Sequence, residues 1–231
     1  MPQPNPAAQR EQLIKYYNIK MGLYSRKELD NGAEIAVWEV TESEEELLSI
    51  ISIPNEELDE LFLTKSGARR REKLAIRALL NTIFEDKVYL GHHDNGSPFI
   101  QNNPVHISIT HTDRFVAIIL HKTEDVGIDI ESLSRDFSAV EKKALSEDEV
   151  DDLSDKNRNQ QLAIYWCAKE ALYKRMSRNG VDFAKQMEVE RFTPHDEGKI
   201  EATFTDKDGL EEEFELEYEI FDNHLLVWLV G

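Results

Sequence analysis

One short stretch, residues 126–131, constrains the fold more than any other. Its sequence, Val-Gly-Ile-Asp-Ile-Glu, alternates apolar residues with acids. This period predicts a strand with one buried face, and it places Asp129 and Glu131 together on the other face. One partner that makes two such carboxylates tolerable away from water is a hard cation, which prefers oxygen ligands. Gly127 leaves room for another backbone or a ligand to approach. The alternative is a strand that ends in two solvated acids.

Composition limits the classes of partner. The chain has 231 residues, enough for one large domain or two small ones, and 40% of them are apolar, enough for a core. The formal net charge of −19 argues against partners with anionic surfaces, so we expect no nucleic acid and no membrane. The single cysteine, Cys167, excludes an internal disulfide and a cysteine-based zinc site. No apolar signal-peptide core or membrane-length apolar run occurs, and we expect a cytoplasmic protein.

The first half combines helices and strands. Residues 1–10 carry three prolines and predict a flexible leader. We expect an N-terminal lobe over residues 11–122 and a C-terminal lobe, which carries the metal site, over residues 123–231. The predicted elements of the first half are a strand at 33–40, a helix at 42–51 capped by Thr41, a helix at 55–63, a helix at 66–84, a turn at 95–99, and strands at 106–112 and 114–121.

The helix at 66–84 begins with a dense positive charge. The basic residues are Lys65, Arg69, Arg70, Arg71, Lys73 and Arg77. Guanidinium groups suit phosphate oxygens, so the cluster predicts an anion site. The alternative is a solvated helix face that balances acids elsewhere in the chain.

His111 ends the strand at 106–112, between two threonines. It can donate to a phosphate oxygen, or it can be an ordinary hydrogen-bonded histidine. The apolar strand at 114–121 leads through a short turn into residues 126–131. That order predicts a hairpin, which would bring His111 close to Asp129 and Glu131.

The second half is dominated by a helix at 160–176, for which Gly180 is the expected stop. Glu170 and Lys174 lie at the edge of its apolar stripe and could be a surface ion pair. Helices are also expected at 137–145 and 146–153, where Ser146 and Glu149 have capping-box spacing. The tail predicts strands at 199–205, 211–221 and 225–230, the middle one with a row of solvated glutamates.

Two motifs together resemble a known family. Gly127, Asp129 and Glu131 match a G-x-D-x-E strand, and the segment Trp166-Cys-Ala-Lys-Glu-Ala-Leu-Tyr-Lys174 matches a W-[S/C/T]-x-K-E-[A/S]-x-x-K helix. The chain therefore resembles the 4′-phosphopantetheinyl transferases of the longer, Sfp-type branch, from about Ala68 to Gly180. The resemblance implies an α+β fold with two similar lobes related by a pseudo-twofold, each a small sheet packed on a long helix. The length favours this single-chain, monomeric branch over the short branch that forms trimers.

The resemblance also implies an activity. Such an enzyme moves the phosphopantetheine arm of coenzyme A, its co-substrate, onto a serine of an apo acyl or peptidyl carrier protein and releases adenosine 3′,5′-bisphosphate. Mg²⁺ is the implied cofactor. The implied metal ligands are Asp129, Glu131 and Glu170; the implied catalytic residues are Glu170, as base, and Lys174, on phosphate; and the implied coenzyme A contacts are Arg69, Arg70, Gly96, Pro98, Thr110, His111 and Lys174.

Two departures from the family pattern leave a rival open. Ser97 stands where the family usually has a lysine that holds the 3′-phosphate, and only Gly180 remains of the usual G-x-G after the helix. The rival is a non-catalytic module that binds coenzyme A or a carrier protein. A third alternative is an acidic scaffold with no small-molecule site. Glu149 matches a position sometimes linked to the site, although its capping box accounts for it.

Overall fold

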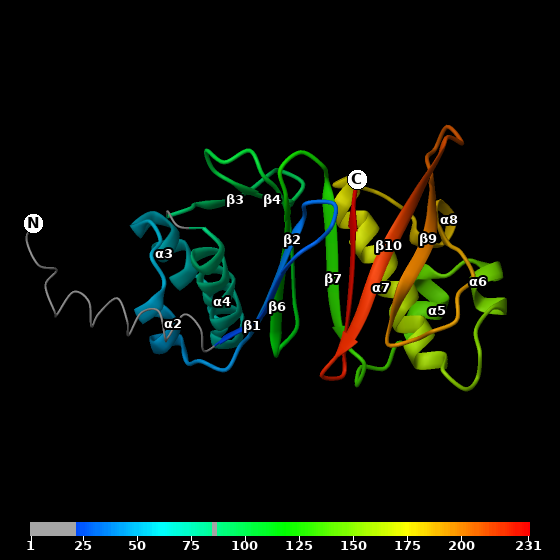
Figure 1. The fold of residues 1–231 in the computed structure, drawn as a ribbon, viewed down its shortest axis with the longest axis horizontal. Coiled ribbons are helices and arrows are strands. Elements are labelled where there is room, and N and C mark those ends of the chain that lie inside the picture. Colours follow the sequence, from blue (N-terminus) through cyan, green and yellow to red (C-terminus); the bar gives the residue numbers. More distant parts are fainter. Residues whose placement is uncertain (1–21, 85–86) are drawn as a thin grey trace, which may run out of the picture.

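A computed structural model describes residues 22–84 and 87–231. The leader expected at residues 1–10 lies outside this part, as does the start of the expected N-terminal lobe. Within it the chain has an α+β fold with two main sheets and a long helix against each, as the sequence predicts (Figure 1). Every helix in the described part is too short or too polar to cross a membrane.

The first sheet is antiparallel and comes from the N-terminal half. Its strands follow the order β1 (Leu23–Glu28), β2 (Glu34–Glu39), β6 (Phe115–His121) and β5 (His106–His111). Helix α4 (Gly67–Ile83) covers one face, with α2 (Glu44–Ile50) and α3 (Asn55–Phe62) outside it. A small hairpin of β3 (Leu90–His92) and β4 (Pro98–Ile100) lies beside this layer.

Local sequence explains where these helices begin. The Ser66 side chain accepts a hydrogen bond from the Arg69 amide and caps α4, whose apolar stripe then enters the core. In α2 the cap is Ser43, which forms a capping box with Glu46. The expectation that Thr41 caps this helix was wrong. Ser43 is the cap because Glu46, three residues after it, completes the capping box.

The second sheet comes from the C-terminal half. Its strands follow the order β7 (Val126–Ser132), β11 (His224–Val230), β10 (Glu211–Phe221), β9 (Glu197–Thr205) and β8 (Met187–Val189). Its helices are α5 (Ser138–Ala144), α6 (Glu147–Asp151), α7 (Arg158–Met176) and α8 (Phe183–Gln186). The predicted tail strands are confirmed. On β10, Phe214, Leu216 and Tyr218 are buried between glutamates.

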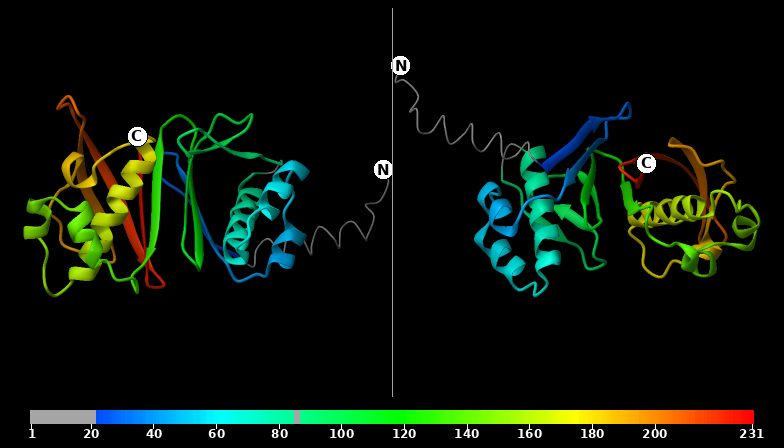
Figure 2. Two further views of the ribbon diagram at one scale, coloured as in Figure 1. Left: turned by 180° about the vertical axis from the view of Figure 1, so that it is seen from behind. Right: turned by 90° about the horizontal axis from the view of Figure 1, so that it is seen from below.

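The two sheets pack back to back. A shared apolar cluster joins β2 and β6 of the first sheet to β7 and β11 of the second, with Ile35, Phe115, Ile128 and Trp228 among its buried members. Figures 1 and 2 show the resulting layers, with α4 outside one sheet and α7 outside the other. The edge strands β5 and β7 therefore meet along a line between the lobes, which we call the seam.

The predicted hairpin of residues 114–121 with 126–131 is wrong. Strand β6 pairs with β2 and β5, whereas β7 pairs with β11. The chain changes sheets between them, because the apolar side of β7 is buried against the first sheet rather than paired with β6. Helix α7 ends at Met176, as predicted, but the residue that stops it is Ser177, in the left-handed region at φ 49°, and Gly180 lies beyond it.

The interior of the C-terminal half contains a buried ion pair. Lys169 is fully buried, and its Nζ lies 2.6 Å from Glu149 Oε2 and also donates to three backbone carbonyls. Glu149 completes the predicted capping box with Ser146. Its other oxygen accepts from the Val189 amide at 2.8 Å. Glu149 thus joins α6, α7 and β8, and its structural interpretation is confirmed.

Candidate functional site

Strand β7 presents its two acids to helix α7. Apolar residues on one side of β7 enter the core between the sheets, so Asp129 and Glu131 point the other way, together with Gly127. A Cβ at position 127 would overlap the carbonyl oxygen of Ala171 in α7. Only glycine allows this close approach, which sets the acids of β7 beside Glu170 and Lys174 of α7.

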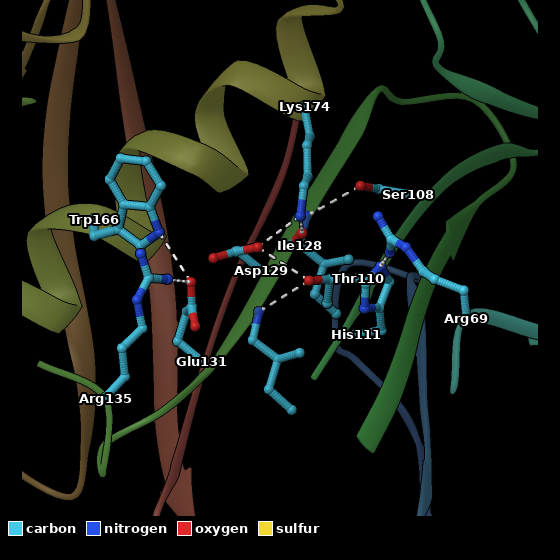
Figure 3. A network of polar contacts seen from close by, with 11 residues as sticks. Arg69, Ser108, Thr110, His111, Ile128, Asp129, Glu131, Arg135, Trp166 and Lys174 are labelled. Carbon is cyan, nitrogen blue, oxygen red and sulfur yellow. Dashed lines mark hydrogen bonds and ion pairs between the residues drawn. The ribbon is translucent and has the colours of Figure 1, made fainter. Parts of the chain in front are cut away.

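Asp129 is held by one of its two oxygens. Its Oδ1 accepts from Lys174 Nζ at 2.6 Å and from Thr110 Oγ1 at 3.0 Å (Figure 3). Lys174 also donates to the carbonyl of Ile128 at 3.0 Å. The second oxygen, Oδ2, is buried and has no hydrogen-bond partner among the described residues. Since Lys174 pairs with Asp129, the alternative of a surface pair between Glu170 and Lys174 is wrong.

Glu131 has a different set of partners. Its Oε1 accepts from Trp166 Nε1 at 3.1 Å and forms an ion pair with Arg135 (Figure 3). The Arg135 guanidinium also lies over the rings of Phe137 and Trp166. Burial raises the pKa of Glu131, and the neighbouring charge of Asp129 raises it further. These acids are therefore not freely solvated, unlike in the alternative considered for residues 126–131.

Glu170 is the most perturbed carboxyl of the group. Burial, reinforced by the charges of Asp129 and Glu131, raises the pKa of Glu170 to about 7, although Lys174 opposes the shift. Within residues 22–84 and 87–231 its carboxylate makes no ion pair closer than 4.0 Å. The charge of Asp129 thus raises the pKa of both Glu131 and Glu170, and the charge of Glu131 adds to the shift of Glu170.

The three acids fit a divalent cation by their chemistry. Oxygen donors of this kind suit Mg²⁺, and the unpartnered buried oxygen of Asp129 is the kind of atom that a cation satisfies. The side chains are not preassembled, since no three His, Cys, Asp or Glu residues of the described chain form a ready metal cluster. Instead, Asp129 forms an ion pair with Lys174, and Glu131 forms an ion pair with Arg135.

Across the seam, part of the basic helix start meets His111. Glu72 of α4 links the two, with Oε1 at 3.0 Å from Arg69 Nη1 and at 3.0 Å from His111 Nε2. Burial alone would raise the pKa of Glu72, but His111 and Arg69 together lower it. The Arg69 side chain remains 60% exposed and can reach a ligand.

Arg70 is engaged elsewhere. Its guanidinium binds both oxygens of Glu44, at 2.7 and 3.0 Å, and the carbonyl of Thr64 at 2.6 Å. These contacts tie α4 to α2 and to the loop before α4. The structure therefore does not bring Arg70 together with Arg69 and His111.

Two cavities flank the turn between β3 and β4, and Gly96 and Pro98 line both. A cavity of about 480 Å³ at the seam is also lined by Ser108 and Lys174, and a cavity of about 360 Å³ is also lined by His111. Gly96 has φ 87°, a conformation that the turn reserves for glycine. Ser97, between Gly96 and Pro98, also lines the larger cavity.

Strand β7 and helix α7 also lie within the stretch that a comparison with known families matches. Residues 125–227 match the family model of the 4′-phosphopantetheinyl transferase superfamily. The match covers β7, α7 and most of the second sheet, and it leaves Arg69 and His111 outside. It supports phosphopantetheine transfer as the general activity. No curated protein matches the chain.

Several residues around the superfamily motifs were not predicted from the sequence. Arg135 follows Glu131 by four positions, a spacing that carries little signal outside a helix. Trp166 belongs to the transferase motif, but its contact with Glu131 depends on how α7 lies on β7. Glu72 was hidden within the basic cluster, and Ser108 within an ordinary strand.

Proposed function

We propose that this protein transfers the 4′-phosphopantetheine arm of coenzyme A to a serine of an apo acyl or peptidyl carrier protein. The serine oxygen attacks the phosphorus next to the pantetheine arm, and adenosine 3′,5′-bisphosphate leaves. The observation that carries the proposal is the meeting of Asp129, Glu170 and Lys174 between β7 and α7, beside a cavity of about 480 Å³ that Lys174 lines. Two lobes within one chain favour the long, monomeric branch.

The metal ligands in this proposal are Asp129, Glu131 and Glu170. Mg²⁺ bound there would neutralise charge that develops on the pyrophosphate. The unpartnered oxygen of Asp129 supports this role, and so do the raised pKa values of Glu131 and Glu170, which burial and the charge of Asp129 cause.

Glu170 is the proposed base. A base works best when its pKa lies near the working pH, and burial beside Asp129 raises the pKa of Glu170 to about 7. Its carboxylate takes the serine proton directly or through a water molecule. Lys174 has three N–H donors, of which the structure uses two, on Asp129 and on the Ile128 carbonyl. The third supports a contact with phosphate.

Coenzyme A would enter along the seam. Lys174, Gly96 and Pro98 line the larger cavity. His111 lines the smaller cavity, which shares Gly96 and Pro98 with it, and Arg69 lies beside His111. These positions support contacts with the phosphates of coenzyme A. Because Arg70 is held by Glu44, we assign the 3′-phosphate to Arg69 and His111 alone.

Intact-mass spectrometry of an apo carrier protein tests the proposal. The carrier is incubated with this protein, coenzyme A and Mg²⁺, and the expected result is a mass increase of one phosphopantetheine arm that a chelator abolishes. Glu170→Gln should remove the increase. The matched control is Glu215→Gln, which makes the same change on the exposed outer side of β10 and should preserve it.

The failure of several acyl and peptidyl carriers to gain mass would contradict the proposal. If coenzyme A still bound, for example in isothermal titration calorimetry, the result would favour the non-catalytic module, with Ser97 as the first position to replace by lysine. If coenzyme A did not bind, the result would favour the scaffold alternative.

A further inference from the structure

The seam between the lobes is held by hydroxyl groups rather than by a continuous sheet. Strands β5 and β7 are edge strands of different sheets. The amides of Ile128 and Ile130, on the edge of β7 that faces β5, donate to Ser108 Oγ at 3.3 Å and to Thr110 Oγ1 at 3.2 Å. Two hydroxyls of β5 therefore do what a neighbouring strand's carbonyls would do.

The proton of the Thr110 hydroxyl has a defined place. A threonine hydroxyl has one proton to donate and two lone pairs to accept with. One lone pair takes the Ile130 amide, and the proton goes to Asp129 Oδ1 at 3.0 Å (Figure 3). Thr110 is 4% exposed, so water does not compete. The hydroxyl has no second proton for a coenzyme A phosphate, which is the role that the family resemblance implies.

This arrangement divides the work between the two oxygens of Asp129. Thr110 and Lys174 both hold Oδ1, and Oδ2 stays buried without a partner in the described part of the chain. Two donors that approach Oδ1 from different elements restrict the rotation of the carboxylate, so they also restrict the direction of Oδ2. Hydrogen bonds that fix a ligand in this way commonly govern metal affinity.

We infer that Thr110 is a positioning residue, which orients Asp129 so that Oδ2 faces a divalent cation. The inference rests on the proposed function, since it assigns Asp129 to the metal. It also gives the seam a role in the reaction, because Thr110 of the N-terminal lobe then orients the metal ligand Asp129 of the C-terminal lobe. The branched Cβ of threonine favours few rotamers, which keeps the hydroxyl in place.

The test is the affinity for Mn²⁺ without coenzyme A, measured from the electron paramagnetic resonance signal of the free ion. Thr110→Val keeps the shape and removes the hydroxyl, and we expect Mn²⁺ affinity to fall about 10- to 100-fold. Thr110→Ser keeps the hydroxyl and should restore most of the affinity. The matched control is Ser108→Ala, which removes the equivalent seam bond but no bond to Asp129, and Mn²⁺ affinity should stay unchanged.

Each outcome decides the matter. If Thr110→Val lowers the melting temperature as Ser108→Ala does but binds Mn²⁺ normally, Thr110 is merely structural and the inference is wrong. If it binds Mn²⁺ normally and raises the KM for coenzyme A, Thr110 contacts the co-substrate and the inference is again wrong. If the unaltered protein binds no Mn²⁺, Thr110 positions no ligand. The failure of the carrier assay alone would overturn the proposed function and leave the Mn²⁺ comparison standing.

Discussion

At the scale of single residues, the site is a set of acids whose charges are only partly balanced. Lys174 balances Asp129 and Arg135 balances Glu131, whereas Glu170 has only indirect help from Lys174. A carboxyl in that position resists ionisation. The cost of ionising it lowers stability, and the same perturbation makes it suited to accept a proton near neutral pH.

Glu170→Gln should therefore abolish transfer and stabilise the metal-free protein at the same time. The pKa of Glu170 is about 7 in the folded protein and near 4.5 when unfolded. Between these values the folded state holds a proton that the unfolded state has lost, so the stability of the unaltered protein falls as pH rises from 4.5 to 7. Glutamine does not titrate.

The difference in melting temperature between the variant and the unaltered protein should be small at pH 4.5 and should grow up to pH 7. Each pKa unit corresponds to about 1.4 kcal/mol. Thermal melts in a chelator follow this difference, and transfer should fall by at least about 100-fold. A difference that does not change with pH would contradict the environment described for Glu170.

Arg69→Ala should raise the KM for coenzyme A more than it lowers kcat. Arg69 is exposed beside His111, so it can bind a phosphate that does not react. Arg71→Ala is the matched control, since it removes the same charge from an exposed position of α4. Steady-state kinetics with coenzyme A varied would distinguish them. If both changes raised the KM for coenzyme A equally, Arg69 would not bind the 3′-phosphate, and the effect would be a general one of charge.

At the scale of elements, the position of α7 on β7 brings the site together. Gly127 allows the close approach, and the buried pair of Lys169 and Glu149 ties the other side of α7 to α6 and β8. Gly127 and Lys169 belong to the sequence motifs, and both contribute to the architecture rather than to the chemistry.

Gly127→Ala should destabilise the protein, by about 1–3 kcal/mol or more, because the added methyl group overlaps the Ala171 carbonyl. Chemical denaturation measures the loss. Gly67→Ala provides the control: at the start of α4 its methyl group would meet only the flexible side-chain ends of Glu44 and Arg70. Equal stabilities of the two variants would show that α7 can move away from β7 without cost.

Lys169→Met should cost about 3–5 kcal/mol, because Glu149 would keep a buried charge without its cation. The double variant Lys169→Met/Glu149→Gln should lose less, since it removes both charges. Urea unfolding of the single and double variants measures the coupling. Additive losses would mean that the two side chains do not stabilise each other.

At the scale of the whole molecule, the sequence predicts the elements better than their assembly. Periodicity located α4, α7 and the strands of the tail to within a few residues, because one buried face marks each of them. The motifs likewise predicted that Asp129, Glu131 and Glu170 lie near one another, and in the structure the charges of Asp129 and Glu131 act on Glu170. The false hairpin of β6 and β7 shows the limit. An apolar strand can pack against any apolar neighbour. The apolar side of β7 packs against the first sheet, so β7 does not pair with β6.

The same limit applies to the site. Arg70 and Arg69 are neighbours with equal chemistry, and only the position of Glu44, which follows from how α2 packs on α4, separates their roles. The contact of Thr110 with Asp129 crosses the seam between two sheets, so no local pattern reveals it.

The back-to-back sheets predict that the lobes depend on each other. Residues 123–231 expressed alone would expose the apolar cluster of β7 and β11, including Ile128, Ile130 and Trp228. We expect this fragment to self-associate or to lose cooperative unfolding, as judged by light scattering and calorimetry. A stable monomer would instead support two independently folding domains divided near residue 122.

The burial of Cys167 has a practical consequence for labelling the protein. The only thiol of the chain is 0% exposed, and burial raises the pKa of Cys167. Maleimide reagents should therefore leave the folded protein untouched. Cysteines introduced at exposed positions of opposite lobes, such as Asp59 and Lys156, would be the only reactive handles. A pair of fluorophores attached there would serve as a ruler for the spacing of the lobes during turnover, without any need to remove the native sulfur first.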